Sequence, residues 1–233
     1  MAVFKEVNMY NPIRSLLSSQ GFIVRGEVKD CDIAAVKDDV LWIVEMKLSA
    51  NLTLIYQALD RKSASDWVFI AIPRPKNARD KNFRKLQKLL KLLDLGLIIV
   101  ALDSPAQYAE ILIYPKGKDN KSNKKSNLLR KEINGRTIDT IGGTTKKSVN
   151  TAYKERCIRI LCLLEAKGNL TAKDLINTFG CDKDTSKILQ NNFLKWFNRV
   201  SKGVYCISPI GKNYLEENKA SSLIIYYRMK AET

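Results

Sequence analysis

The sequence predicts a mixed α/β protein, of the α+β kind, in which helices flank a sheet and a smaller helical domain follows. Two observations predict the first domain: short apolar runs rich in β-branched and aromatic residues, and amphipathic segments between them. A third predicts the second domain, because helical periodicity returns after a lysine-rich stretch with few large apolar groups. We therefore expect divisions at residues 1–114, 115–150, 151–217 and 218–233.

The first elements are a helix and three strands. Residues 5–20 fit an amphipathic helix, since Ile13, Leu16 and Leu17 form an apolar stripe. Three short apolar runs bounded by polar turns then predict strands, and these strands cover residues 22–28, 33–36 and 40–48.

The remaining elements of the first domain alternate between helix and strand. Leu52, Ile55 and Leu59 follow helical spacing within residues 52–64, and the apolar run at 67–73 predicts a buried strand. A basic loop and helix at 74–94 precede two further strands, at 96–102 and 108–114. This order predicts a mixed sheet flanked by helices.

Composition excludes several classes of site. The chain of 233 residues is 45% hydrophobic, enough to bury a core in one or two domains. It has no histidine, which excludes Ser-His-Asp triads and two-histidine zinc hydrolases. The five cysteines lack close metal-ligand spacing and are expected to be reduced core residues. Without a long apolar run or a signal-peptide core, we expect a cytoplasmic protein with no membrane span.

Acidic and basic residues gather on the hairpin formed by the second and third strands. The run before Glu45 is apolar at every position, which indicates a strand buried on both faces, and Glu45 and Lys47 share one of its faces. Counting back from the turn at Asp38 and Asp39 sets Asp32 beside Glu45. Adjacent carboxylates repel, and Mg²⁺ binds such oxygen pairs together with water and phosphate. We therefore expect Asp32 and Glu45 to bind Mg²⁺ or Mn²⁺, with Lys47 positioning a water or neutralising charge on a phosphate.

These residues resemble the PD-(D/E)XK nuclease superfamily, whose pattern is an Asp, a spacer, and then Glu-x-Lys on the next strand. Here the pattern is Asp32, twelve residues, and Glu45-Met46-Lys47, although Cys31 stands where the superfamily has proline. The stretches at residues 6–36, 44–48 and 57–75 look similar to a bacterial family of PD-(D/E)XK-type phosphodiesterases. The resemblance implies a restriction-endonuclease-like fold and a metal-dependent hydrolase. In the alternative interpretation, Glu45 and Lys47 form a surface salt bridge and Asp32 is a turn residue.

Four further residues are candidates for the same site. Glu6 matches an N-terminal acid of the family, which implies help in holding metal, and Glu27 is a third acid near the end of its strand. The resemblance also covers Gln57, as a contact to substrate or water, and Arg61, as a phosphate contact. All four also suit ordinary solvated positions. Asp30 is a weaker candidate ligand than Asp32 because it falls in the turn.

The net charge of +16 favours a nucleic-acid partner, although a basic surface can also simply solubilise a protein. Residues 115–150 are rich in Lys, Asn and Ser and predict a flexible, basic connector that contacts phosphate. Within it, residues 134–148 suit an extended arm or a short hairpin.

The sequence of the second domain predicts a winged helix-turn-helix. A helix at 152–166 is followed by a short helix capped by Thr171 and by a longer helix at 182–197, in which we expect Phe193 to lie in the core. Two strands about a turn at Lys202 and Gly203 come next, and then a closing helix. DNA is the partner we expect, although winged helices also bind proteins. The apolar tail at 218–233 suits packing on another surface, and a second copy in a homodimer is one candidate. The nucleic-acid contacts we expect are the outward long polar side chains Lys183, Lys187, Gln190, Asn191, Lys195 and Lys202.

Three functions remain open from the sequence. The first is a metal-dependent nuclease, or phosphodiesterase, that acts on DNA. The second is a non-enzymatic DNA-binding regulator built on a nuclease-like fold, and the third is an RNA-processing nuclease with the same chemistry.

Overall fold

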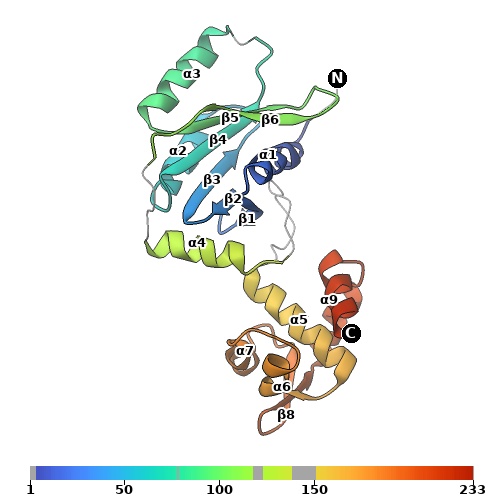
Figure 1. Ribbon diagram of the computed structural model, residues 1–233. Helices are drawn as coiled ribbons and strands as arrows, with labels where there is room; N and C mark the ends of the chain where they lie inside the picture. The colour runs from blue at the N-terminus through green and yellow to red at the C-terminus, as the bar shows by residue number, and fades with distance from the viewer. Residues whose placement is uncertain (1–3, 78, 118–122, 138–150, 233) are drawn as a thin grey trace. The chain divides into compact units, whose positions relative to one another are not determined.

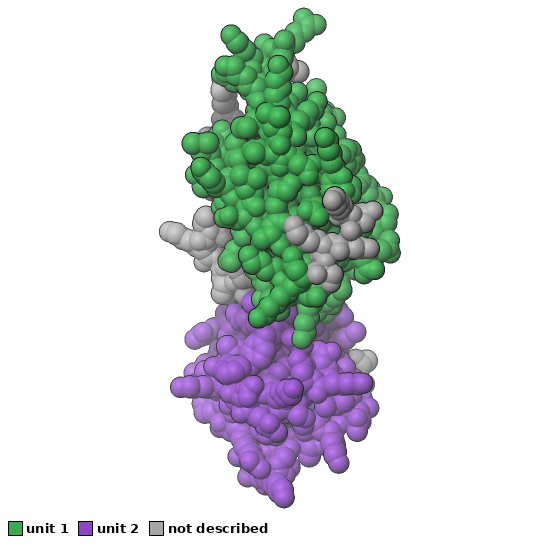
Figure 2. Space-filling model, turned by 90° about the vertical axis from the view of Figure 1, so that its left-hand side faces the viewer, with its two compact units in different colours: residues 1–149 green, residues 150–233 purple. Residues whose placement is uncertain are grey.

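The chain forms two compact units in the computed structural model, residues 1–149 and residues 150–233 (Figures 1 and 2). The structure describes residues 4–77, 79–117, 123–137 and 151–232. Over these ranges, every helix is too short or too polar to cross a membrane.

Unit 1 is built on one mixed sheet of six strands that follow one another in chain order. The strands pair antiparallel at both edges, between β1, β2 and β3 and between β5 and β6, and parallel in the middle, from β3 through β4 to β5. Their bounds are β1 Ile23–Val28, β2 Cys31–Lys37, β3 Val40–Met46, β4 Trp67–Pro73, β5 Gly96–Ala101 and β6 Tyr108–Ile113.

Helices cover both faces of this sheet (Figure 1). On one face α1 (Val7–Ser19) buries Met9, Tyr10 and other side chains against the strands. On the other face lie α2 (Leu52–Arg61), α3 (Lys81–Leu92) and α4 (Lys124–Asn134), which share a second apolar core. The prediction of a mixed sheet flanked by helices is confirmed, and the arrangement fits a restriction-endonuclease-like fold.

The register of the β2–β3 hairpin decides which side chains meet near its open end. Lys37 pairs with Val40 next to the turn, and the ladder continues to Ile33 opposite Val44. The next residues along the two strands are Asp32 and Glu45, so the hairpin brings these acids side by side.

Helix α4 lies inside the segment for which the sequence predicts a flexible connector. Its N-cap is Asn123, whose side chain accepts a hydrogen bond from the Ser126 N–H, and it packs on β1 and β2. Leu129 and Ile133, four residues apart on one face, are buried in the core of unit 1. These contacts make 124–134 part of the folded unit, while most of the predicted arm at 134–148 lies outside the described residues.

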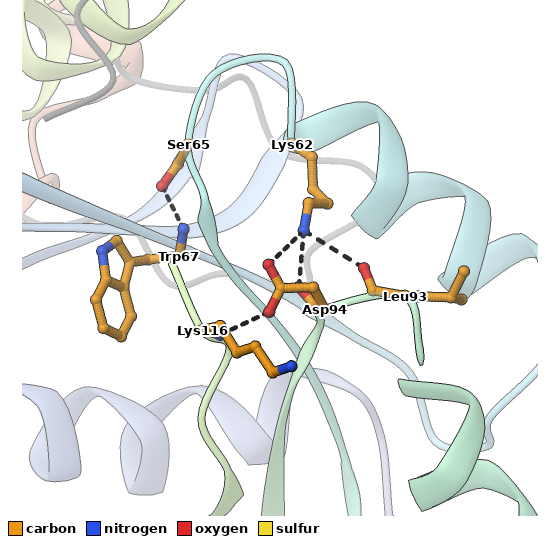
Figure 3. Close-up of polar contacts among 6 residues, drawn as sticks. All are labelled: Lys62, Ser65, Trp67, Leu93, Asp94 and Lys116. Carbon is orange, nitrogen blue, oxygen red and sulfur yellow. Dashed lines mark hydrogen bonds and ion pairs between the residues drawn. The ribbon is translucent and has the colours of Figure 1, made fainter. Parts of the chain in front are cut away.

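A polar cluster holds the end of α2 against the entry to β5 (Figure 3). The ammonium of Lys62 donates to the Asp94 carbonyl at 2.8 Å, to the Asp94 carboxylate at 3.1 Å and to the Leu93 carbonyl at 3.4 Å. The other carboxylate oxygen of Asp94 accepts the Lys116 N–H at 2.6 Å. One acid thus joins the end of α2, the turn before β5 and the segment after β6.

Unit 2 combines helices with a small antiparallel sheet in the order β7-β9-β8. Thr171 and Asp174 form a reciprocal capping box at the start of α6, which confirms the predicted cap at Thr171. The elements are α5 Ala152–Lys167, β7 Leu170–Thr171, α6 Ala172–Asn177, α7 Thr185–Asn191, β8 Phe197–Ser201, β9 Val204–Ile207, α8 Pro209–Glu217 and α9 Ser222–Glu232.

The end of the longer helix in unit 2 differs from the sequence-based expectation. The longer helix was expected to continue through Phe197 with Phe193 in the core, but α7 ends at Asn191 and Phe193 is 73% exposed. Asn192 ends the helix in a left-handed conformation, and its side chain bonds the backbone of Phe197, the first residue of β8. The apolar tail forms α9 and packs on α5 within the same chain.

Candidate active site

Five charged side chains from four elements of unit 1 meet around the open end of the β2–β3 hairpin. Asp32 and Glu45 come from β2 and β3, Lys47 directly follows β3, Arg61 ends α2, and Glu6 precedes α1. Arg61 contacts Glu45, and the carboxyl group of Glu45 contacts that of Asp32. Asp32 interacts by charge with Lys47, and Lys47 in turn contacts Glu6. Four of these five residues were candidates for the catalytic or metal site, and the fifth, Arg61, was the expected phosphate contact.

The backbone of β3 and β4 fixes the centre of this set. Asp32 Oδ2 accepts a hydrogen bond from the Met46 N–H at 2.7 Å, which holds the carboxylate against β3. The Lys47 N–H donates to the Ala71 carbonyl of β4 at 3.1 Å, so the backbone stays paired just beyond β3. The positions of both side chains therefore depend on the central strands of the sheet.

Glu45 is almost fully buried, with 1% of its surface exposed. Its Oε1 accepts a hydrogen bond from the Arg61 Nε at 2.6 Å, and its carboxyl group also bonds that of Asp32. Burial, followed by the charge of Asp32, raises the pKa of Glu45 to about 7. Burial also raises the pKa of Asp32, against the effect of the Met46 N–H and Lys47. Without a cation between them, the two acids therefore disfavour being charged at the same time.

Lys47 and Glu6 form the more exposed end of the set. The Lys47 ammonium lies 3.4 Å from Glu6 Oε2, and both side chains are about 30% exposed. This ammonium remains within reach of solvent and still interacts with the charge of Asp32. A cation so placed can stabilise negative charge on a group that approaches the carboxylates.

Arg61 contacts groups of the protein itself. Besides Glu45, its Nη2 donates to the Asp30 carbonyl in the β1–β2 turn. The sequence offered no signal for the pairing with Glu45, because it arises from the path of α2 across the sheet. Asp30 itself lies in the turn, as expected, and contributes its backbone to this contact.

The other two candidates lie on adjoining elements. Gln57 is half-buried on α2, one turn before Arg61. Glu27, in β1, has a positive φ of 49°, and its carbonyl accepts a hydrogen bond from Arg136 Nη2 at 3.1 Å. The buried Arg136 also bonds the Gly26 carbonyl, so the segment after α4 fixes this part of β1.

The donor set suits a hard divalent cation with few protein ligands. In the part of the chain that the structure describes, no three or more His, Cys, Asp or Glu side chains gather as a metal site. The pair Asp32 and Glu45 supplies two carboxylates in contact, which is the number Mg²⁺ commonly takes from a protein. Burial and then the charge of Asp32 raise the pKa of Glu45, and a cation bound between the two carboxylates would relieve their repulsion.

The predicted nucleic-acid contacts of unit 2 are all exposed. Lys187, Gln190 and Asn191 lie on α7 and Lys183 precedes it. Lys195 lies in the turn after α7 with a positive φ, and Lys202 lies in the β8–β9 turn.

The comparisons with known proteins found one matching family. Its description is "Putative PD-(D/E)XK phosphodiesterase (DUF2161)", and the match covers residues 98–214, half of the chain. The matched part begins in β5 and ends in α8, so it leaves out Asp32, Glu45 and Lys47. No curated protein and no solved structure matched the chain. By the extent of this match, the chain belongs to the PD-(D/E)XK phosphodiesterase family.

Proposed function

We propose that this protein is a metal-dependent nuclease that hydrolyses phosphodiester bonds in DNA. The observation that carries the proposal is the contact between the carboxyl groups of Asp32 and Glu45, with the Lys47 ammonium interacting by its charge with Asp32. Family membership supports phosphodiesterase chemistry, and the net charge of +16 supports a polyanionic substrate.

Asp32 and Glu45 would hold Mg²⁺ or Mn²⁺, with Glu6 assisting from the Lys47 end. The ion would act as a Lewis acid on a phosphate oxygen and lower the pKa of the attacking water. Lys47 would orient that water and stabilise the charge that grows on the phosphate in the transition state. Gln57 would contact substrate or water, and Glu27 would support the site from β1.

Unit 2 would bind the nucleic acid as a winged helix. Its order of elements, α5, β7, α6, α7, β8, β9 and α8, supports this assignment. The exposed Lys187, Gln190 and Asn191 of α7 have the long side chains that reach phosphates and base edges.

The test is a cleavage assay with single- and double-stranded DNA and RNA in Mg²⁺ or Mn²⁺. We expect Asp32→Asn and Glu45→Gln to reduce cleavage of DNA by more than about 100-fold while binding is retained. Asp39→Asn, an exposed position in the turn of the same hairpin, is the matched control and should cut as wild type does.

The second candidate function is a DNA-binding regulator without catalysis, which the exposed cations and amides of unit 2 favour. Wild-type protein that binds DNA but cuts no substrate with either ion would select the regulator. Cleavage confined to RNA would select the RNA-processing enzyme.

A further inference from the structure

A cavity of about 560 Å³ lies in unit 1 between α2, the β1–β2 turn and α4. Leu59 of α2 and Leu128 and Leu129 of α4 give it apolar walls. Its volume is within the usual range for pockets that bind small molecules. Leu128 is 42% exposed, so an apolar surface faces solvent at this cavity.

Charged groups line the rest of the cavity. The cations are Lys29 of the turn, Arg61 of α2 and Lys125 of α4, and the carboxylates are those of Asp30 and Asp60. Such a wall is complementary to a ligand with an anionic group, an apolar ring, and donors such as sugar hydroxyls or an exocyclic amine. A nucleotide has all three parts.

Contacts between the turn after α2 and the start of α4 hold one side of this cavity in place. The Lys125 ammonium donates to Ser63 Oγ at 3.0 Å, and the Asn123 side chain donates to the Ser63 carbonyl at 2.8 Å. An ammonium has three N–H donors, so Lys125 can bind Ser63 and still donate to a ligand.

Arg61 connects the cavity with the candidate active site. Arg61 lines the cavity, and its Nε bonds the buried carboxylate of Glu45. Cys31, which precedes Asp32, also lines the cavity. A ligand in the cavity therefore lies next to the residues that hold both carboxylates.

We propose that this cavity binds one nucleotide unit of the nucleic-acid substrate, with its phosphate toward Arg61 and Lys125 and its base against the leucines. The assignment rests on the proposed nuclease function, since it identifies the substrate unit that lies beside the cleaved bond. It also gives α4, inside the predicted connector, a role in substrate recognition.

The test measures binding of deoxyadenosine 5′-monophosphate to the full chain by calorimetry in EDTA, so that no metal contributes. We expect the nucleotide to bind at least about tenfold more tightly than inorganic phosphate or deoxyadenosine, because only the nucleotide contacts both kinds of wall. Leu128→Asp should weaken binding by at least about tenfold, and Lys125→Ala by about threefold to tenfold.

Two controls match these variants. Lys124→Ala removes the neighbouring exposed cation of α4, which does not line the cavity, and Leu92→Asp alters an exposed leucine on α3. Both should bind the nucleotide as wild type does, and far-UV circular dichroism checks that each variant is folded.

The results separate this proposal from the nuclease itself. Nucleotide binding no tighter than phosphate binding, or unchanged in Leu128→Asp, overturns the nucleotide site even if the protein cuts DNA. Nucleotide binding that depends on Leu128 in a protein that cuts nothing overturns the nuclease and leaves nucleotide recognition standing.

Discussion

The candidate active site and the cluster around Asp94, both in unit 1, place their acids in opposite electrostatic situations. Asp94 accepts hydrogen bonds from the Lys62 ammonium and from the backbone N–H of Lys116 (Figure 3). Burial acts to raise its pKa, but these donors prevail and hold the pKa of Asp94 below its ordinary value. Glu45 is buried against a second carboxyl group, and its pKa is raised to about 7 in spite of Arg61.

The contrast distinguishes Asp94, which stabilises the fold, from Glu45, whose environment suits a role in binding metal or in catalysis. The contacts of Asp94 favour its charged form and join three segments of the chain. The pair Asp32 and Glu45 concentrates negative charge that the protein only partly compensates, and such sites are more often functional.

The largest effect that tests this comparison is on catalysis. Lys47→Ala should reduce DNA cleavage by about 100-fold to 1,000-fold, because it removes the cation whose charge acts on Asp32. Lys62→Ala should leave cleavage per folded molecule unchanged and lower the stability by about 1 kcal/mol. Cleavage rates and denaturant unfolding of the two variants check both statements.

The opposite results for these two variants would contradict the comparison between the cluster around Asp94 and the candidate active site. If Lys62→Ala lost cleavage while folded, or Lys47→Ala cut normally, the assignment of the two clusters would be wrong. Lys47→Arg keeps the charge but alters its shape, and partial activity in that variant would support the role of a positioned cation.

The next largest effect is on how the free energy of unfolding of the metal-free protein depends on pH. A folded-state pKa of about 7, raised from an ordinary value of 4.5, makes Glu45 contribute stability below pH 4.5. That contribution is lost as the pH rises through 7, because the unfolded chain releases the proton earlier. The loss amounts to about 3 kcal/mol, at 1.36 kcal/mol for each pKa unit.

Glu45→Gln tests this effect because it keeps the shape and removes the titration. In EDTA, its free energy of unfolding should change less between pH 5 and pH 8 than that of wild type. Mg²⁺ or Mn²⁺ should stabilise wild type at pH 8 by about 1.4 kcal/mol at ten times Kd, and the variant by less. Equal pH profiles for the two proteins would show that Glu45 is not the titrating group.

The part of the candidate site that lies within a single hairpin could be predicted from the sequence. Counting from the turn set Asp32 beside Glu45, and the observed register agrees because strand pairing advances one residue at a time from the turn. The order of helices and strands from α1 to β6 followed equally from periodicity, since each apolar run is long enough to define its element.

Features that depend on distant contacts were not predictable. The pairing of Arg61 with Glu45 requires the path of α2 over the sheet. Helix α4 lies in a stretch whose composition is that of a loop, and burial of Leu129 and Ile133 against β1 and β2 outweighs that composition. Phe193 looked like a core residue because nothing local predicted the left-handed Asn192 that ends α7.

The smallest effect concerns Asp94, whose lowered pKa makes it contribute stability above the ordinary value of 3.8. This contribution is lost as the pH falls through the lowered folded-state pKa. Since 36% of the side chain is exposed, solvent screens the ion pair, and Asp94→Asn should cost about 0.5 kcal/mol at pH 7. Asparagine also tolerates the positive φ of 52°, so the backbone remains unstrained.

Asp94→Ala is the informative comparison at the same position. Alanine removes both carboxylate contacts and must adopt the left-handed conformation, so its cost in denaturant unfolding at pH 7 should exceed that of Asp94→Asn by about 1 kcal/mol. As the pH falls through the lowered folded-state pKa of Asp94, the Asp94→Asn variant should approach wild type, since the wild-type carboxyl group becomes neutral, whereas Asp94→Ala should remain less stable. A loss in Asp94→Asn that persisted at low pH would mean that the carboxylate acts through its shape rather than its charge, and the contrast with Glu45 would then lose its electrostatic basis.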